Sequence, residues 1–500
     1  MMRPAILLLI TTLSFATEPN AATKRWWTYT TALSNDGMRG RNTGSEDYNR
    51  AAEYVATQFA RLGLKPAGTL GYFQSVPLKS IRLVPEESEA AVVNGGKVTN
   101  LAWFRQITTR VHEGMPLKLD APMVFVGTES EPGVDLKGKV AVMLDTPRFI
   151  AGIHPYSRKL SATEGALATI TIPSVEGPEP MRWPVSYAVT MSIDGAPSPA
   201  RPESVPAFSL NASAADVLLA GSPHNYEELL SLAKAGKPVP SFALPSNFRS
   251  SLKLAHEFFA SDNIIAVLPG SDPKLADEYV AVSAHLDGYG IGEPWHGDNI
   301  YNGAFDDAAY VATLIDFADH LKETHRALKR SILFCVVTGE EKGLLGSRYF
   351  AANPTVDKSK IVADINLDIL RPIFPLKILT VLGLKMSTLG ETATKVGTSM
   401  GIRVQEDLEP LRGLIRRSDH MSFMQIGVPS LGFVFGYEPG SPEEVVYRKW
   451  YLERYHTPAD DLKQPWVPQA AAKFNEFFAR MVETVADTAE RPRVITNPVP

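Results

Sequence analysis

The sequence has almost no cysteine. The single one among its 500 residues, Cys335, has no second thiol in the chain with which to form a disulfide. It lies in the apolar run Ser331–Val337, and a thiol in such a run is typically buried and inert rather than a nucleophile. A chain of this length buries enough apolar surface to fold without disulfides, even outside the cytosol.

The sequence also lacks a large excess of charge of either sign. Fifty lysines and arginines stand against 55 aspartates and glutamates, for a formal net charge of −5. Because no basic surplus is available to neutralise phosphates, we expect no nucleic-acid partner. Apolar residues make up 44% of the chain and charged residues 21%, which is typical of a folded globular protein and excludes a largely disordered one.

No apolar run is long enough to span a membrane. The most apolar stretch, Pro4–Phe15, falls short of the ~20 residues that a membrane helix needs. Arg3 precedes it, and small residues follow at Ser14-x-Ala16 and at Ala21–Ala22. This pattern predicts a signal peptide over residues 1–22, with a frayed apolar N-terminus as the alternative. We therefore expect an exported protein, periplasmic or extracellular, with no membrane span in the mature chain.

The pattern of apolar residues changes twice along the chain. Apolar residues recur every three or four positions from Tyr48 to Leu62, which predicts a helix, and Gly63 is a typical helix end. Short β-like runs dominate from residue 115 to residue 248. Strands and helices alternate after that. The pattern predicts an α/β fold with residues 115–248 as a β-rich domain inserted into a main domain formed by residues 23–114 and 249–500.

The alternating part predicts a mixed, largely parallel central sheet sandwiched by helices. Its strand candidates are apolar on both faces, which is typical of strands covered by helices on both sides. These strands are Asn263–Leu268, Tyr279–Ala284, Ile332–Val337, Ile361–Leu367, Leu376–Leu382 and Pro429–Phe435. The helices predicted between and after them are Asp307–Leu321, Gly343–Ala352, Ser387–Met400 and Val467–Ala489.

Ionisable side chains follow three of these strands, at the end of the sheet where ligands bind in such folds. They are His285 and Asp287 after the second strand, Glu340 and Glu341 after the third, and Asp368 after the fourth. Two further candidates, Asp306 and His456, lie in loops. Because residues two apart in an extended chain share a face, the carboxylate of Asp287 can take the proton on the second nitrogen of a metal-bound His285.

Each of these elements has a simpler explanation when taken alone. A His-x-Asp pair is often a capping pair, a Glu-Glu pair often begins an exposed helix, and Asp306-Asp307 can cap the next helix. Their joint placement favours a metal site instead. Two histidines and three carboxylates suit zinc, with manganese or cobalt as substitutes. Five ligands exceed what one tetrahedral zinc needs, so two ions that share a carboxylate are the simplest solution.

The sequence resembles the co-catalytic dizinc aminopeptidases, whose relatives include glutamate carboxypeptidase II and the transferrin receptor ectodomain. Besides the ligand positions, which occur in the family's order, residues 33–45 are similar to the opening of the family's catalytic domain. The middle of the chain resembles a protease-associated domain, with sequence segments typical of that domain at Val124–Gly127, residues 135–139 and Ile170–Pro173. The resemblance covers nearly the whole mature chain and implies a zinc exopeptidase fold.

The resemblance implies a role for each ligand candidate. His285 and Asp368 would hold one zinc ion, Glu341 and His456 would hold the second, and Asp306 would bridge the two.

It also implies roles around the ions. Asp287 would orient His285, Glu340 would act as the general base, and the peptide bond between Asp306 and Asp307 would be cis. The hydroxyl of Tyr455 would stabilise the oxyanion, the alternative being an ordinary packed aromatic ring. Arg417 is a candidate for binding polar groups of the substrate, the alternative being a surface salt bridge.

The chain departs from the family pattern at one place. Ala309-Tyr310 replaces the usual Ser-Gly after Asp306, so a bulky side chain stands at the start of the next helix. His296, in the loop before Asp306, we interpret as a rim residue because the ligand count is already complete.

The function implied by the resemblance is that of a secreted or periplasmic zinc-dependent exopeptidase, most simply an aminopeptidase that acts on peptides with two zinc ions per chain. A carboxypeptidase of the glutamate carboxypeptidase II type is the main alternative, because the metal motif does not set which end of a peptide is cut. A single-zinc glutaminyl cyclase and a receptor ectodomain without enzymatic activity fit less well, because Glu340 and all five ligands are present.

Overall fold

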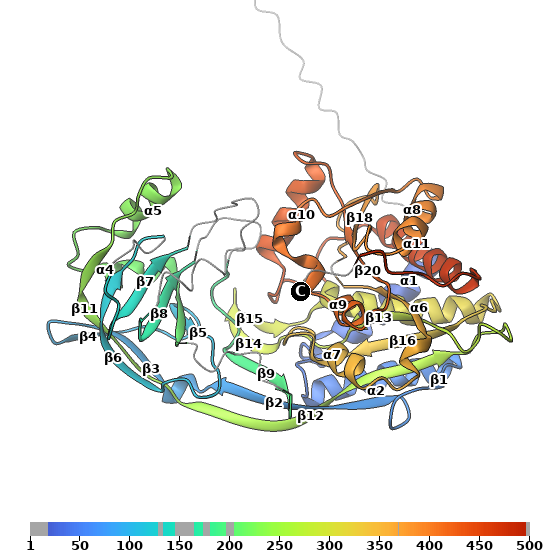
Figure 1. Cartoon of the computed structure of the whole chain (residues 1–500), viewed down its shortest axis with the longest axis horizontal. Helices are drawn as coiled ribbons and strands as arrows, with labels where there is room; N and C mark the ends of the chain where they lie inside the picture. The colour runs from blue at the N-terminus through green and yellow to red at the C-terminus, as the bar shows by residue number, and fades with distance from the viewer. Residues whose placement is uncertain are drawn as a thin grey trace, which may run out of the picture.

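The computed structural model describes residues 19–128, 134–145, 165–173, 181–196, 205–368 and 370–496. Residues 1–18 of the predicted signal peptide lie outside the described residues, and Ala21 and Ala22 begin the first helix. Two lobes are visible in Figure 1, and the long paired strands β2 (Phe73–Leu83) and β12 (Leu254–Leu268) run between them. Among the described residues, none of the helices has the length and hydrophobicity that crossing a membrane requires.

The larger lobe is built on a mixed ten-stranded sheet, which establishes the predicted α/β class. In spatial order its strands are β19 (Arg403–Gln405), β18 (Ile378–Leu382), β20 (Ser430–Phe435), β17 (Ile361–Asn366), β13 (Tyr279–His285), β16 (Ser331–Val337), β12, β2 and β9 (Val189–Ile193), with β1 (Lys65–Pro66) paired to β12. The four central strands, from β20 to β16, run parallel, whereas β18, β12, β2 and β9 join by antiparallel pairing.

The central strands are apolar on both faces because each face packs against helices. Along β13, Val280 and Val282 face one core while Ala281, between them, faces the other. Strand β16 alternates in the same way, and Cys335 is fully buried in the second core, as its apolar surroundings predict. This two-sided burial excludes water from the sheet and leaves its strand ends as the place for polar chemistry.

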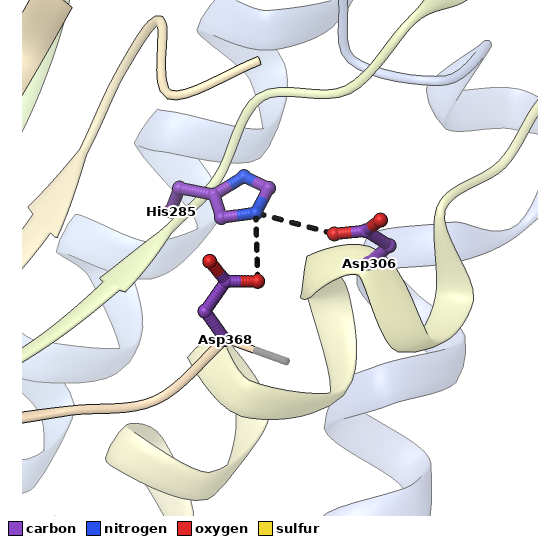
Figure 2. Close-up of side chains that lie close together, drawn as sticks. All are labelled: His285, Asp306 and Asp368. Atoms are coloured by element: carbon purple, nitrogen blue, oxygen red, sulfur yellow. Dashed lines mark ion pairs between the residues drawn. The ribbon is translucent and has the colours of Figure 1, made fainter. Parts of the chain in front are cut away.

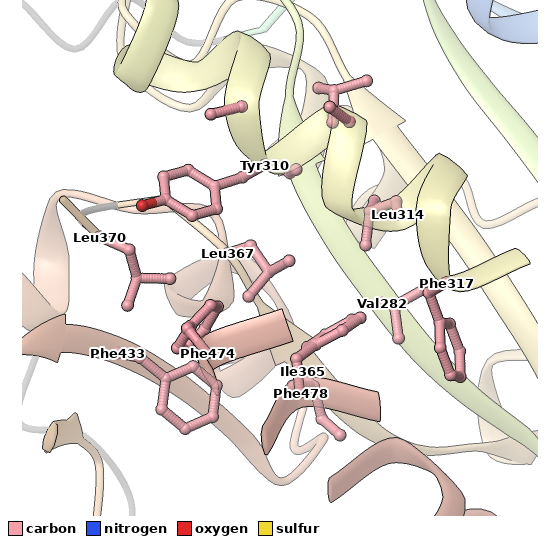
Figure 3. Packing of buried hydrophobic residues seen from close by; sticks show 14 of the residues in the cluster. Val282, Tyr310, Leu314, Phe317, Ile365, Leu367, Leu370, Phe433, Phe474 and Phe478 are labelled. Atoms are coloured by element: carbon pink, nitrogen blue, oxygen red, sulfur yellow. The ribbon is translucent and has the colours of Figure 1, made fainter. Parts of the chain in front are cut away.

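The helices of this lobe are α1 (Ala21–Ser34), α2 (Glu46–Leu62), α6 (Ala309–Glu323), α7 (Leu345–Ala352), α8 (Leu389–Ser399), α9 (His420–Gln425), α10 (Pro442–Glu453) and α11 (Pro468–Asp487). Helix α2 confirms the predicted helix, since Ser45 caps its first turn and Gly63 ends it with φ of +87°. Figure 3 shows α6 and α11 closing one face, with Phe317 and Phe478 against the strands.

The smaller lobe contains an eight-stranded sheet with a hydrophobic core of its own. Its strands are, in order, β4 (Lys97–Asn100), β3 (Glu89–Asn94), β11 (Phe242–Ser251), β6 (Lys118–Phe125), β7 (Val140–Leu144), β8 (Ala168–Ile172), β10 (Ala207–Leu210) and β5 (Ile107–Thr109), and helices α4 (Ala215–Leu219) and α5 (Tyr226–Lys234) accompany it.

Near the predicted domain boundaries, some strands belong to a different sheet from the one that the boundaries imply. Strands β3, β4 and β5 precede residue 115 yet lie in the smaller sheet, and β9, within residues 115–248, pairs with β2 of the larger sheet. The boundaries at 114/115 and 248/249, and the identification of the middle region as a protease-associated domain, stay predictions.

Candidate metal centre

Three of the predicted ligands meet at the carboxyl end of the larger sheet. His285 ends β13, Asp368 follows β17, and Asp306 lies in the turn that leads into α6. Nε2 of His285 lies 3.4 Å from Oδ1 of Asp306 and 3.8 Å from Oδ1 of Asp368, and Figure 2 shows the three side chains converging. Parallel strands place their carboxyl ends at one edge, which is why residues 83 positions apart come together here.

A second group of ligands shares Asp306 with the first. Nε2 of His456 lies 3.3 Å from Oδ2 of Asp306 and 3.2 Å from Oε2 of Glu341. The two carboxylate oxygens of Asp306 therefore face different histidines. This is the arrangement expected of a carboxylate that bridges two ions.

The spacing and the unpaired atoms of these side chains fit a metal. Ligand atoms about 2.0–2.2 Å from a tetrahedral zinc lie roughly 3.3–3.6 Å apart, close to the distances between the histidine nitrogens and the oxygens of Asp306. His285 Nε2, Asp306 Oδ2 and Glu341 Oε1 are buried and have no hydrogen-bond partner among the described residues. Buried polar atoms without partners are costly, and an ion bound between them removes that cost.

Buried groups contact His285 on the side away from the other ligands. Its Nδ1 lies 3.1 Å from the backbone carbonyl oxygen of Asp287 and 3.7 Å from the carboxylate of the same residue. Its backbone N–H donates to Oδ2 of Asp307. Burial alone would lower the pKa of His285, but Glu340 and the neighbouring aspartates raise it well above its ordinary value. The ring is therefore fixed with Nε2 facing the carboxylates.

Glu340 lies beside both groups of ligands and lines the pocket that opens onto them. Its Oε2 is 3.8 Å from Nε2 of His285, and its backbone N–H donates to Oδ1 of Asp287. Burial raises the pKa of Glu340 well above its ordinary value, and the nearby carboxylates of Asp368 and Glu341 add to that shift. A carboxyl group with a raised pKa, next to a metal site, is suited to accept a proton.

Tyr455 and Arg417 line the same pocket and contact each other. Nη2 of Arg417 donates to the Tyr455 hydroxyl at 3.1 Å, and the Tyr455 ring stacks on His456 with ring centroids 3.6 Å apart. Burial raises the pKa of Tyr455 well above its ordinary value, so the phenol keeps its proton. The hydroxyl is therefore a hydrogen-bond donor at the mouth of the site.

Arg371 and Tyr289 also belong to the site, although nothing in the sequence singled them out. Arg371 is buried, stacks over the Trp450 ring at 4.5 Å and places Nη2 3.4 Å from Oδ2 of Asp306. Burial alone would raise the pKa of Asp306, but this guanidinium and the two histidines lower it well below its ordinary value. Tyr289 contacts His456. The only available signals were the proximity of Arg371 to Asp368 and of Tyr289 to His285 in the sequence.

The turn before α6 differs from the capping alternative. Ala308 is the N-cap of α6 and no side chain caps it, while Oδ2 of Asp307 accepts from the backbone of His285 instead. The capping interpretation of Asp306-Asp307 is therefore wrong. The peptide bond between the two aspartates is cis, as the resemblance implied.

Tyr310 occupies the interior rather than the pocket. Its ring meets that of Phe474 edge-on, with centroids 6.3 Å apart (Figure 3), so the departure from the family pattern is absorbed by core packing. His296 is exposed in the hairpin of β14 (Gly290–Trp295) and β15 (Asp298–Tyr301), away from the ligands.

The comparisons with known proteins agree with this site. Residues 263–482, which include the ligand positions, match the model of Peptidase family M28. Aminopeptidase Y of Saccharomyces cerevisiae is 30% identical over 241 residues, which cover 47% of this chain and 40% of that protein. Probable leucine aminopeptidase 2 of Aspergillus fumigatus is 24% identical over 65% of this chain and 57% of its own length. Each match thus spans less than two thirds of the curated relative.

Solved structures share the fold over almost the whole chain. An aminopeptidase from Aneurinibacillus sp. strain AM-1 superposes with a TM-score of 0.61 at 18% identity, over 96% of both chains. A zinc aminopeptidase from Bacillus subtilis superposes with a TM-score of 0.59 at 18% identity, over 95% of this chain and 97% of its own. Both lobes therefore follow a known architecture.

Proposed function

We propose that the chain, whose residues 263–482 match the model of Peptidase family M28, is a zinc-dependent aminopeptidase that removes residues from the N-terminus of peptides. The observation that carries the proposal is the pair of ligand groups that share Asp306, with Glu340 beside them. The names of the relatives support the choice of an aminopeptidase over a carboxypeptidase.

The five ligand candidates divide between two zinc ions. His285 and Asp368 would hold one ion, Glu341 and His456 would hold the other, and Asp306 would contribute one oxygen to each. Bound zinc lowers the pKa of a water molecule to about 7 and polarises the scissile carbonyl. Peptide hydrolysis needs both effects, because neutral water is a poor nucleophile and the amide carbonyl a poor electrophile.

Glu340 has the position and the chemistry of the general base. It would take a proton from the attacking water and deliver it to the nitrogen of the departing amine. Burial raises its pKa, which favours uptake of the proton. Glu341 is unsuited to this role, since its Oε2 faces His456 as a ligand would.

Tyr455 and Arg417 would act on the substrate. The Tyr455 hydroxyl would donate to the oxygen that becomes negative during attack. Arg417, through its bond to that hydroxyl, would fix the donor and bind polar groups of the substrate. Arg371 would balance the negative charge of the ligand set from beneath Asp306.

We further propose that the signal peptide is removed and that the mature protein is periplasmic or extracellular. The support is the charged, apolar and small-residue pattern of residues 1–22. N-terminal sequencing of the mature protein, after expression with its leader, tests this step. A mature chain that still begins at Met1 would contradict it.

A matched set of substrates tests the proposed activity. Purified zinc-loaded protein is assayed on aminoacyl p-nitroanilides, on the same compounds with an acetylated amino group, and on N-acyl dipeptides with a free carboxylate. We expect cleavage only where the amino group is free. Cleavage of the N-acyl dipeptides alone would instead establish a carboxypeptidase, and cleavage of none would exclude the proposal.

A further inference from the structure

His456 is the most exposed of the ligand candidates. Its side chain is 24% exposed, whereas that of Asp306 is 6% exposed and that of His285 is fully buried. It lies in the turn after α10, with φ of +54°, and so has no strand to hold it. A ligand in this position needs a partner outside its own backbone to fix the direction of its ring.

The hydroxyl of Tyr289 is that partner. It lies 3.0 Å from Nδ1 of His456, and the two ring centroids are 4.6 Å apart. Nε2 on the other side of the same ring faces Glu341 and Asp306. If Nε2 binds a metal, Nδ1 keeps its proton and donates a hydrogen bond to the Tyr289 oxygen, which selects the tautomer that the metal requires.

We propose that Tyr289 is a positioning residue for His456 and raises the affinity of the metal position to which His456 contributes. This inference rests on the proposed two-ion site. In this role Tyr289 would bind neither the ion nor the substrate directly. It acts by holding one tautomer and one orientation of the imidazole.

Tyr289 is itself held by Lys342 and by Tyr187 from the middle region of the chain. Nζ of Lys342 lies 4.3 Å from the centre of the Tyr289 ring and donates to the Tyr187 hydroxyl at 2.8 Å. Tyr187 precedes β9, in the middle region of the chain, and its ring centroid lies 6.1 Å from that of Tyr289. The middle region thus contributes to the support of the exposed metal position.

The two metal positions therefore differ in what stabilises them. The ring of His285 is tied to the backbone carbonyl two residues along its own segment. The ring of His456 is tied to a side chain 167 positions away, which Lys342 and Tyr187 hold in turn. Removing one hydroxyl is accordingly expected to weaken one position and to leave the other unchanged.

Tyr289→Phe tests the proposal, with Tyr301→Phe as the matched control. Tyr301 is a buried neighbour whose ring lies 6.2 Å from that of Tyr289, and its hydroxyl donates to the backbone oxygen of Glu293 rather than to a ligand. Zinc affinity at each position is measured for the wild type and both variants by competition with a chromophoric chelator. The activity of each is then followed as a function of free zinc.

In Tyr289→Phe we expect a 10–100-fold loss of affinity at one position, as for other partners of metal-bound histidines, and none at the other. Excess zinc should restore its turnover, which it would not do for a misfolded protein. If the wild type binds two ions and Tyr289→Phe binds both as tightly as Tyr301→Phe does, only the positioning role of Tyr289 is overturned. A wild type that binds fewer than two ions would instead overturn the two-ion site.

Discussion

Replacing Glu340 by glutamine distinguishes the role of a general base from that of a metal ligand more clearly than any other substitution. The amide keeps the size and hydrogen-bonding reach of the carboxylate but cannot accept the proton of the attacking water. Glu340 would act on the attacking water, whereas Glu341, 3.2 Å from Nε2 of His456, would bind the same ion as that histidine. We therefore expect turnover to change and metal binding to persist.

General acid–base catalysis contributes about 10²–10⁴ in rate, which corresponds to about 2.7–5.5 kcal/mol of activation free energy. Turnover of Glu340→Gln should fall by that factor. The free energy of unfolding should not fall with it, because burial already disfavours the charged carboxylate, as its raised pKa shows. The fall in turnover would therefore come from the missing proton acceptor and not from unfolding of the protein.

The assay combines turnover on an aminoacyl p-nitroanilide, zinc content by elemental analysis and thermal unfolding on one preparation. Glu341→Gln is the matched control, since it makes the same chemical change at the adjacent residue. It should lower zinc content and thermal stability together, because a ligand charge is lost. Near-normal turnover in Glu340→Gln with zinc retained would refute the assignment of the base.

Three further predictions concern metal content, packing and pH. His456→Ala should lower the zinc content from two ions per chain towards one, and elemental analysis that still finds two would contradict the ligand assignment. Phe474→Ala should cost about 3–5 kcal/mol of unfolding free energy in urea, because this ring is buried, whereas Phe258→Ala, at a position 71% exposed, should cost less than about 0.5 kcal/mol. Asp364 is buried, and that burial raises its pKa well above the ordinary value. The protonated carboxyl therefore contributes stability to the folded protein below the unfolded-state pKa near 4, and this contribution is lost as pH rises through the folded-state pKa. Asp364→Asn should consequently raise the melting temperature more at pH 8 than at pH 5. The same change in melting temperature at both pH values would refute this.

The sequence was sufficient to predict the elements that carry the ligands. Strands β13, β16 and β17 are short, mostly apolar runs that are buried on both faces, so their ends were recognisable from the chain alone. Because parallel strands end at one edge of a sheet, it followed that His285, Glu341 and Asp368 would approach one another. The helix that ends at Gly63 was equally predictable, since capping depends on neighbours in the chain.

Some elements were not predictable in this way. Helix α10 was not expected, because its buried Tyr447, Trp450 and Tyr451, although spaced three and four positions apart, lie in a largely polar segment. The pairing of β9 with β2 also depends on contacts that no local pattern records. Such elements owe their stability to tertiary packing more than to their own sequence.

Tertiary structure alone decided how the ligands are held. The sequence by itself determined that His285, Glu340, Glu341 and Asp368 meet at one edge of the sheet, because strand ends and residue types are local properties. It did not determine that Arg371 lies under Asp306, that Tyr289 contacts His456, or that Tyr187 from the middle region holds Lys342 beside them. Contacts across 155 to 167 positions depend on the path of the whole chain, and that path is fixed only when both cores are packed.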